Sequence, residues 1–163
     1  IHIGHAKTAT TSFQQGLFSN EELFFPLGRF GVGGDLTASD IMREFLWEGL
    51  YLDDWRYSRN RERYSKEIKE LIAQAESLGK MPVVSNEAIA MNCFGKADYA
   101  TRFARLRDIF GEDAKILFFV REQRSFVKSF YSSLICDAGA STSVQEFLDI
   151  NFHLPFHPLN IVN

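Results

Sequence analysis

Short apolar runs alternate along the chain with longer segments in which apolar residues recur at helical spacing. The runs end at Ile3, Ser85 and Val120. We interpret each as a strand covered on both faces, because continuous apolar runs are typical of buried parallel strands. Strands that alternate with helices favour a parallel sheet with right-handed crossovers. The pattern therefore predicts an α/β fold of three layers, α/β/α, with a central parallel sheet.

Helical periodicity follows the first strand and recurs through the rest of the chain. The first expected helix ends at Leu17, and the others cover the segments 35–50, 68–78, 98–110, 123–135 and 143–151. Thr37 or Ser39 is the expected N-cap of the second of these helices. Gly79 and Gly111 are expected just past the ends of two others, where glycine commonly adopts a left-handed conformation.

Two segments lack a clear apolar period. Pro26 and four glycines between 28 and 34 predict a loop for the segment 19–36. The segment 51–63 carries four arginines interleaved with acidic residues. We interpret it as a solvated helix face held by salt bridges, with a basic rim over an anionic ligand as the alternative.

Composition narrows the class of protein. The 163 residues fit one domain, residues 1–163, and 45% are apolar, which is enough for a substantial core. The formal charge of −3 argues against a broad nucleic-acid surface, so we expect no nucleic-acid partner. No window approaches the roughly 18 apolar residues of a membrane span. Cys93 and Cys136 suffice neither for a disulfide framework nor for a zinc site.

The two ends of the chain carry their own signals. Ile1 already lies in an expected strand, and the tail HLPFHPLNIVN stops without a closing element. We therefore expect the single domain to be incomplete at both ends. A cytoplasmic location is the expectation, and a membrane-anchored form stays open because residues before Ile1 are expected to be missing.

The first segment, IHIGHAKTATTSFQQGL, combines a strand end, a tight turn and a hydroxyl-rich helix start. The first amides of a helix have no internal partner and carry partial positive charge, so this geometry favours an anion such as phosphate or sulfate. Lys7 adds a full positive charge. The spacing differs from the usual nucleotide P-loop, because Gly4 lies only three residues before Lys7 and Ala6 precedes it. The alternative is an ordinary turn with a threonine N-cap.

Polar clusters follow all three expected strands. They are the turn from Gly4 to Thr11, the segment Ser85–Glu87, and Arg121 with the residues after it. Ligands of parallel α/β sheets bind at the carboxyl ends of the strands. Arg121 and Ser129, eight residues on, could hold a second phosphate; taken alone, a salt-bridged arginine and a surface serine are the simpler interpretation.

Together the two motifs resemble sulfotransferases that use 3′-phosphoadenosine 5′-phosphosulfate (PAPS). In that family a KTGTT-like loop binds the 5′-phosphosulfate, and an arginine followed eight residues later by a serine binds the 3′-phosphate. Lys7–Thr11 matches the loop, and Arg121, Ser129 and Tyr131 match the second motif. HIGHAKTATTSFQQ is similar to the bacterial and carbohydrate-acting branch. The resemblance covers about residues 1–135 and implies a P-loop NTPase-like topology.

The resemblance implies a set of residues and ligands. PAPS would be the sulfate donor, 3′-phosphoadenosine 5′-phosphate (PAP) the product, and no metal would be needed. The implied cofactor-binding residues are Lys7, Thr8, Ala9, Thr10, Thr11, Ser12, Arg121 and Ser129. Ala9 departs from the family, which usually has glycine there; if that backbone needs a positive φ, alanine costs about 1 kcal/mol or more.

The expected chemistry is an in-line transfer of a sulfuryl group to a hydroxyl or amine acceptor, a glycan or a small metabolite. Lys7 would stabilise charge on the bridging oxygen. Glu87 is the first candidate for the base, and its alternative role is an acid at a helix N-terminus. His5 is the second candidate, because it lies in the loop and has a suitable pKa. His2 is expected to be embedded in a strand.

Two other functions stay open. One is a P-loop kinase, which a magnesium requirement would distinguish and which the missing GK[ST] motif disfavours. The other is a domain of the same fold that binds a nucleotide or glycan without turnover, which Ala9 keeps open. The acceptor and the oligomeric state are not specified by any motif.

Overall fold

A five-stranded sheet forms the centre of the protein. The computed structural model describes residues 1–4, 9–30, 36–37, 39–90, 97–139 and 141–152. The strands are β1 (His2–Gly4), β2 (Phe24–Phe30), β3 (Leu36–Thr37), β4 (Met81–Asn86) and β5 (Leu117–Phe119). Their order is β3-β2-β4-β1-β5; the last four are parallel, and β3 runs antiparallel to β2. The predicted parallel sheet is confirmed, with β1 between β4 and β5.

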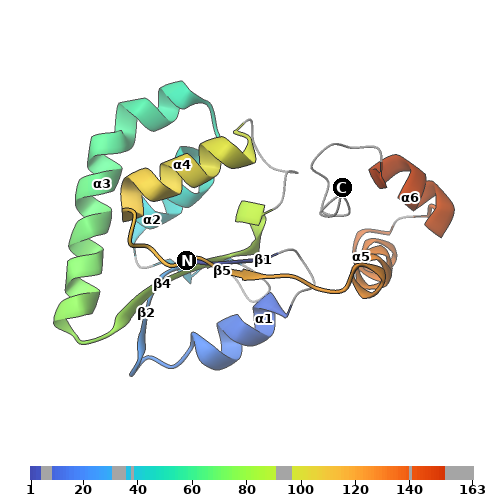
Figure 1. Cartoon of the computed structure of the whole chain (residues 1–163), viewed down its shortest axis with the longest axis horizontal. Helices are drawn as coiled ribbons and strands as arrows, with labels where there is room; N and C mark the ends of the chain where they lie inside the picture. Colours follow the sequence, from blue (N-terminus) through green and yellow to red (C-terminus); the bar gives the residue numbers. More distant parts are fainter. Residues whose placement is uncertain (5–8, 31–35, 38, 91–96, 140, 153–163) are drawn as a thin grey trace.

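Helices lie on both faces of the sheet. They are α1 (Thr10–Ser12) with the π-helical turn η1 (Phe13–Leu17), α2 (Asp40–Glu44) with the π-helical turn η2 (Phe45–Gly49), α3 (Asp54–Ser77), the 3-10 turn η3 (Glu87–Ala90), α4 (Tyr99–Phe110), α5 (Gln123–Ala138) and α6 (Val144–Phe152). Figure 1 shows α2, α3 and α4 over one face and α1 on the other. This arrangement is compatible with three α/β/α layers.

Local sequence signals fix several helix ends. Ser39 caps α2 by accepting a hydrogen bond from the Met42 amide, as one of the two expected caps. At the end of α3, Gly79 has a φ of +66°. The Gly79 amide donates to the Glu76 carbonyl and the Lys80 amide to the Ala75 carbonyl, which is the Schellman arrangement. The predicted glycine stop is therefore confirmed.

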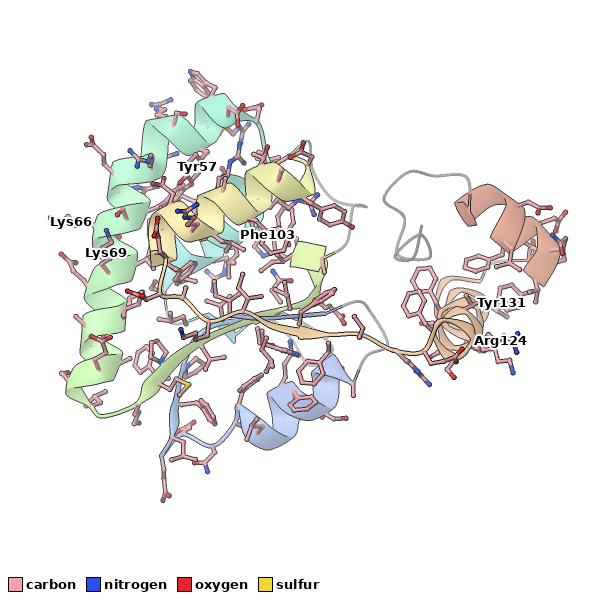
Figure 2. All side chains as sticks on the ribbon, in the orientation of Figure 1. Tyr57, Lys66, Lys69, Phe103, Arg124 and Tyr131 are labelled. Carbon is pink, nitrogen blue, oxygen red and sulfur yellow. The ribbon has the colours of Figure 1, made fainter. Side chains whose placement is uncertain are left out.

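The arginine-rich segment 51–63 lies mostly within α3, a single helix of 24 residues. Its arginines pair with acidic side chains: Arg56 with Glu48, Arg61 with Asp108 and Arg63 with Glu44. The interpretation as a salt-bridged face is therefore confirmed for these three. Tyr57, from the same helix, lies between α3 and α4 and donates to Asp108 (Figure 2).

The expected loop over 19–36 is wrong, because its middle forms β2. Phe24 to Phe30 pairs in parallel with β4 along its whole length. Pro26 pairs with Val83 of β4 beside an irregularity, because the register shifts between Pro26 and Gly28, and proline is found at such bulges. Among the described residues, the other neighbour, β3, pairs with Gly28 and Arg29 and does not reach Pro26.

The expectation of a strand buried on both faces is wrong for β5. Leu117 and Phe118 are 46% and 45% exposed, and Val120, just beyond, is 63% exposed. β5 is the last strand in the order, so among the described strands it pairs only with β1. The helix that follows does not cover it: α5 and α6 form a hairpin beside the carboxyl end of β5 (Figure 1).

The hairpin of α5 and α6 has a small hydrophobic cluster of its own. Phe126 and Phe147 are buried at its centre, separate from the main cluster formed by the sheet and α2 to α4. Ser143 and Glu146 form a capping box at the start of α6: the Glu146 amide donates to Ser143 Oγ, and the Ser143 amide donates to Glu146 Oε2.

Two arginines of α4, Arg102 and Arg105, are buried in the main body. Arg105 donates to the carbonyls of Gly49, Leu50 and Leu52 at 3.0, 3.2 and 2.8 Å, and to Asp54 at 2.6 Å. It therefore binds the carbonyls where η2 ends and joins α4 to the start of α3. The apolar period of the segment 98–110 gave no sign of this role.

Within the part of the chain that the structure describes, no helix is both long and apolar enough to cross a membrane.

Candidate functional site at the carboxyl edge of the sheet

The three expected polar clusters follow three neighbouring strands at one edge of the sheet. In the parallel register, His2 lies opposite Ser85, and Gly4 lies opposite Phe119. The turn after Gly4 and the segments after β4 and β5 therefore begin at the same edge. This is the edge at which parallel α/β sheets bind ligands.

The turn after β1 carries the first candidate cluster. His5, Ala6, Lys7 and Thr8 lie outside the described residues. Ala9 is exposed, with a φ of +64°, and its carbonyl accepts the first helical hydrogen bond from the Phe13 amide at 3.1 Å. Thr10 opens α1, Thr11 is half-buried and Ser12 is exposed.

The backbone of Ala9 meets the condition under which alanine is costly. In the described residues Ala9 is the single non-glycine residue with a positive φ, and a left-handed conformation costs an L-residue about 1–2 kcal/mol. The backbone of Ala9 therefore has a left-handed conformation, which glycine adopts without this cost. Alanine is accommodated here at the cost of strain.

Glu87 lies directly after β4, as the first residue of η3. The residue before it, Asn86, is buried; its Oδ1 accepts from the Ala88 amide at 2.8 Å, and its Nδ2 donates to the Tyr51 hydroxyl at 3.5 Å. These contacts fix the turn that carries Glu87. Its half-buried position at the start of a helical turn suits both expected roles, a base at the edge or an acid near amide groups.

Arg121 lies at the same edge, two residues after β5, and is exposed. The next residue, Glu122, caps α5 by accepting from the amides of Arg124 and Ser125 at 2.9 and 2.7 Å. The Ser125 and Arg124 hydrogen bonds lower the pKa of the Glu122 carboxyl. Arg121 is thus held between the strand end and a capped helix.

Ser129 and Tyr131 lie on α5, which stands beside the sheet rather than over it (Figure 1). Ser129 is half-buried. Tyr131, labelled in Figure 2, donates to the Thr142 carbonyl at 2.7 Å. Its hydroxyl therefore joins α5 to the segment before α6. The structure brings Arg121 to the edge, whereas Ser129 lies on the hairpin beyond it.

A buried polar group under α1 was not identified from the sequence as part of the site. His2, Ser85 and Gln14 are 1%, 1% and 2% exposed. His2 lies in β1, as expected, and burial lowers the pKa of its imidazole below the usual 6.5. No local signal distinguishes Gln14 in the sequence, because the next residue, Gln15, is also a glutamine and is exposed.

Two cavities differ in their relation to this edge. A cavity of about 420 Å³ lies at the opposite edge, where Ile1 precedes β1 and Ile116 precedes β5. It is therefore remote from the candidate site. A smaller cavity of about 190 Å³ reaches Ser85 from the α1 side and is lined by Phe18 and Val83 among others.

Metal ligands do not gather in the described residues, where no group of three or more His, Cys, Asp or Glu side chains could hold an ion. In the described residues the candidate site comprises the turn at Ala9, Glu87 and Arg121 at the edge of the sheet, and Ser129 on α5, the helix that follows Arg121.

Comparison of the chain with protein-family models, with curated proteins and with solved structures gave no match.

Proposed function

We propose that this chain is a PAPS-dependent sulfotransferase. The observation that carries the proposal is the juxtaposition of the turn after β1, Glu87 and Arg121 at one edge of three adjacent parallel strands. The order β2-β4-β1-β5, with β1 inside the sheet, supports a P-loop NTPase-like topology. The positive φ of Ala9 supports a turn like the glycine-containing loop of the resembling family.

The proposed reaction is an in-line displacement at sulfur. The acceptor oxygen bonds to sulfur as the bond between sulfur and the bridging oxygen breaks, and PAP leaves. Glu87 takes the proton of the acceptor hydroxyl, and Lys7 stabilises the charge that grows on the bridging oxygen. Amides and hydroxyls from Thr8 to Ser12 hold the 5′-phosphate, and Arg121 with Ser129 holds the 3′-phosphate.

Binding of PAP is the first test. Calorimetry should detect PAP binding to the wild-type chain, and Arg121→Ala should weaken it by about 1.5–3 kcal/mol, the range for hydrogen bonds to charged groups. The same substitution should matter much less for adenosine 5′-phosphosulfate, which lacks the 3′-phosphate. Arg124→Ala, at an exposed residue in the first turn of α5, is the matched control. Equal losses for both ligands would make Arg121 merely structural.

Transfer of labelled sulfate from PAPS to an acceptor panel is the second test. Glu87→Gln should keep the affinity for PAP and lower turnover by about 10²–10⁴-fold, because it removes the base without changing cofactor contacts. A reaction that requires magnesium and a nucleoside triphosphate would instead indicate a kinase.

A nucleotide-binding domain without turnover is the second candidate, and the strained Ala9 favours it. PAP binding in the absence of any transfer would support this function.

A further inference from the structure

Three polar side chains form a buried hydrogen-bonded chain between α1 and the sheet. His2 comes from β1, Ser85 from β4 and Gln14 from η1, the continuation of α1. All three are almost completely buried. Each therefore depends on the others, because a buried polar group that loses its partner is strongly destabilising.

Gln14 makes the contact between helix and sheet. Its Nε2 donates to the Ser85 carbonyl at 3.3 Å and to Ser85 Oγ at 3.1 Å. His2 Nδ1 lies 2.7 Å from the same Oγ. Since the serine oxygen accepts from Gln14, its own hydrogen can be donated to His2 Nδ1. One serine thus links a helix to two neighbouring strands.

The His2 ring is held on its other side by aromatic contacts. Its Nε2 has no hydrogen-bond partner among the described residues. The rings of Phe13, Phe18 and Phe119 lie 5.9, 5.2 and 5.1 Å from it, centroid to centroid. The polar chain therefore ends in an apolar pocket, and Gln14 is the link by which it reaches the helix.

The two residues of this contact lie close in sequence to two parts of the candidate site, the turn at Ala9 and Glu87. Gln14 lies in the helical segment that begins just after Ala9. Ser85 lies two residues before Glu87, and Asn86 between them fixes the next turn through the Ala88 amide. The Gln14 amide thus connects the helical segment after Ala9 to the strand that leads to Glu87.

We propose that Gln14 is a positioning residue that holds the cofactor-binding turn at a fixed distance from Glu87. This rests on the proposed function. Gln14 contacts neither PAPS nor the acceptor in this proposal, and it acts through Ser85. A displacement of about 1 Å between reacting groups can cost about 10²-fold in rate.

The experiment compares Gln14→Leu with Gln15→Leu, an exposed neighbour on the same turn, in the full chain. Gln14→Leu should lower kcat by about 10–100-fold in the folded fraction, while PAP affinity changes by less than about threefold. Gln15→Leu should leave both unchanged. A residue that only stabilises the fold would lower the melting temperature and leave kcat of the folded fraction normal.

Ser85 gives an independent variant if Gln14→Leu does not fold. Ser85→Ala removes one hydroxyl and should reproduce the loss of kcat, whereas Ser85→Thr keeps the hydroxyl and should retain most of the activity. Normal kcat in the Gln14 and Ser85→Ala variants would overturn this inference alone. Absence of PAP binding and transfer in the wild-type chain would overturn the proposed function as well.

Discussion

Ala9 carries strain that glycine would relieve. Replacing it removes about 1–2 kcal/mol of left-handed strain, and the greater freedom of the unfolded chain offsets about 0.4–1 kcal/mol of that gain. We therefore expect Ala9→Gly to raise the free energy of unfolding, measured by urea denaturation. Ala73→Gly, at an exposed position inside α3, should lower it by about 1 kcal/mol. A loss of stability in Ala9→Gly would contradict the positive φ.

His2 should make stability depend on pH. Burial lowers its pKa below the usual 6.5, so the unfolded chain binds a proton in a range where the folded chain does not. The stability that the neutral, buried His2 contributes is fully present above about pH 6.5, and it is lost as the pH falls from there toward the pKa of His2 in the folded chain.

The measurement is the free energy of unfolding from about pH 8 to about pH 5. The wild-type chain should lose stability across the lower part of this range, and His2→Phe, which keeps an aromatic ring among the phenylalanines, should show a flatter dependence. Identical slopes in the two proteins would mean that His2 titrates normally in the fold.

At the scale of elements, Arg105 links α4 to the carbonyls at the end of η2. Arg105→Met leaves three carbonyls without their charged donor. We therefore expect it to lower the free energy of unfolding, measured by urea denaturation, by about 3 kcal/mol, the upper end for hydrogen bonds to charged groups. Arg105→Lys should recover only part of it, because an ammonium lacks the planar fork. Arg107→Met, on the exposed side of α4, should cost less than about 1 kcal/mol. Equal losses at both positions would contradict this role.

Local backbone chemistry explains which elements could be predicted from the sequence. The Gly79 stop and the Ser39 cap each depend on residues within one turn. The three parallel strands were found because each is a short apolar run, although the run of β5 is exposed at Leu117 and Phe118. β2 was missed because Pro26 and the following glycines suggest a turn, whereas the proline lies beside an irregularity in the pairing with β4, which is distant in the sequence.

The candidate site was predictable to a similar degree. Glu87 and Arg121 could be predicted as site residues, because each follows the end of an apolar run that is visible in the sequence. Gln14 could not be assigned, because its partner Ser85 is 71 residues away. No local pattern contains a contact of that kind.

At the scale of the whole molecule, the two hydrophobic clusters divide the chain into parts of unequal size. Phe147 is central to the smaller one, and truncating a buried phenylalanine typically costs about 3–5 kcal/mol. Phe147→Ala should therefore open the hairpin of α5 and α6 while the main body stays folded.

Hydrogen exchange distinguishes these parts. In Phe147→Ala, amides of α5 and α6 should exchange much faster, and those of α3 and β4 should keep their protection. Ile68→Ala, in the main cluster, is the complementary variant and should lower protection in α3 and β4. Loss of protection throughout the chain in Phe147→Ala would show that the two clusters unfold together.

The place of β1 between β4 and β5 has a consequence for the order of folding. Its first residue meets Ser85, 83 residues away, and its other neighbour, β5, lies farther still along the chain. Contacts between such distant residues form slowly, because a long loop must close before they contribute. The edge that carries the candidate site is therefore completed late, when β1 enters between β4 and β5. On the proposed function, PAP would bind the finished edge alone, so the earlier steps of folding would proceed without its help.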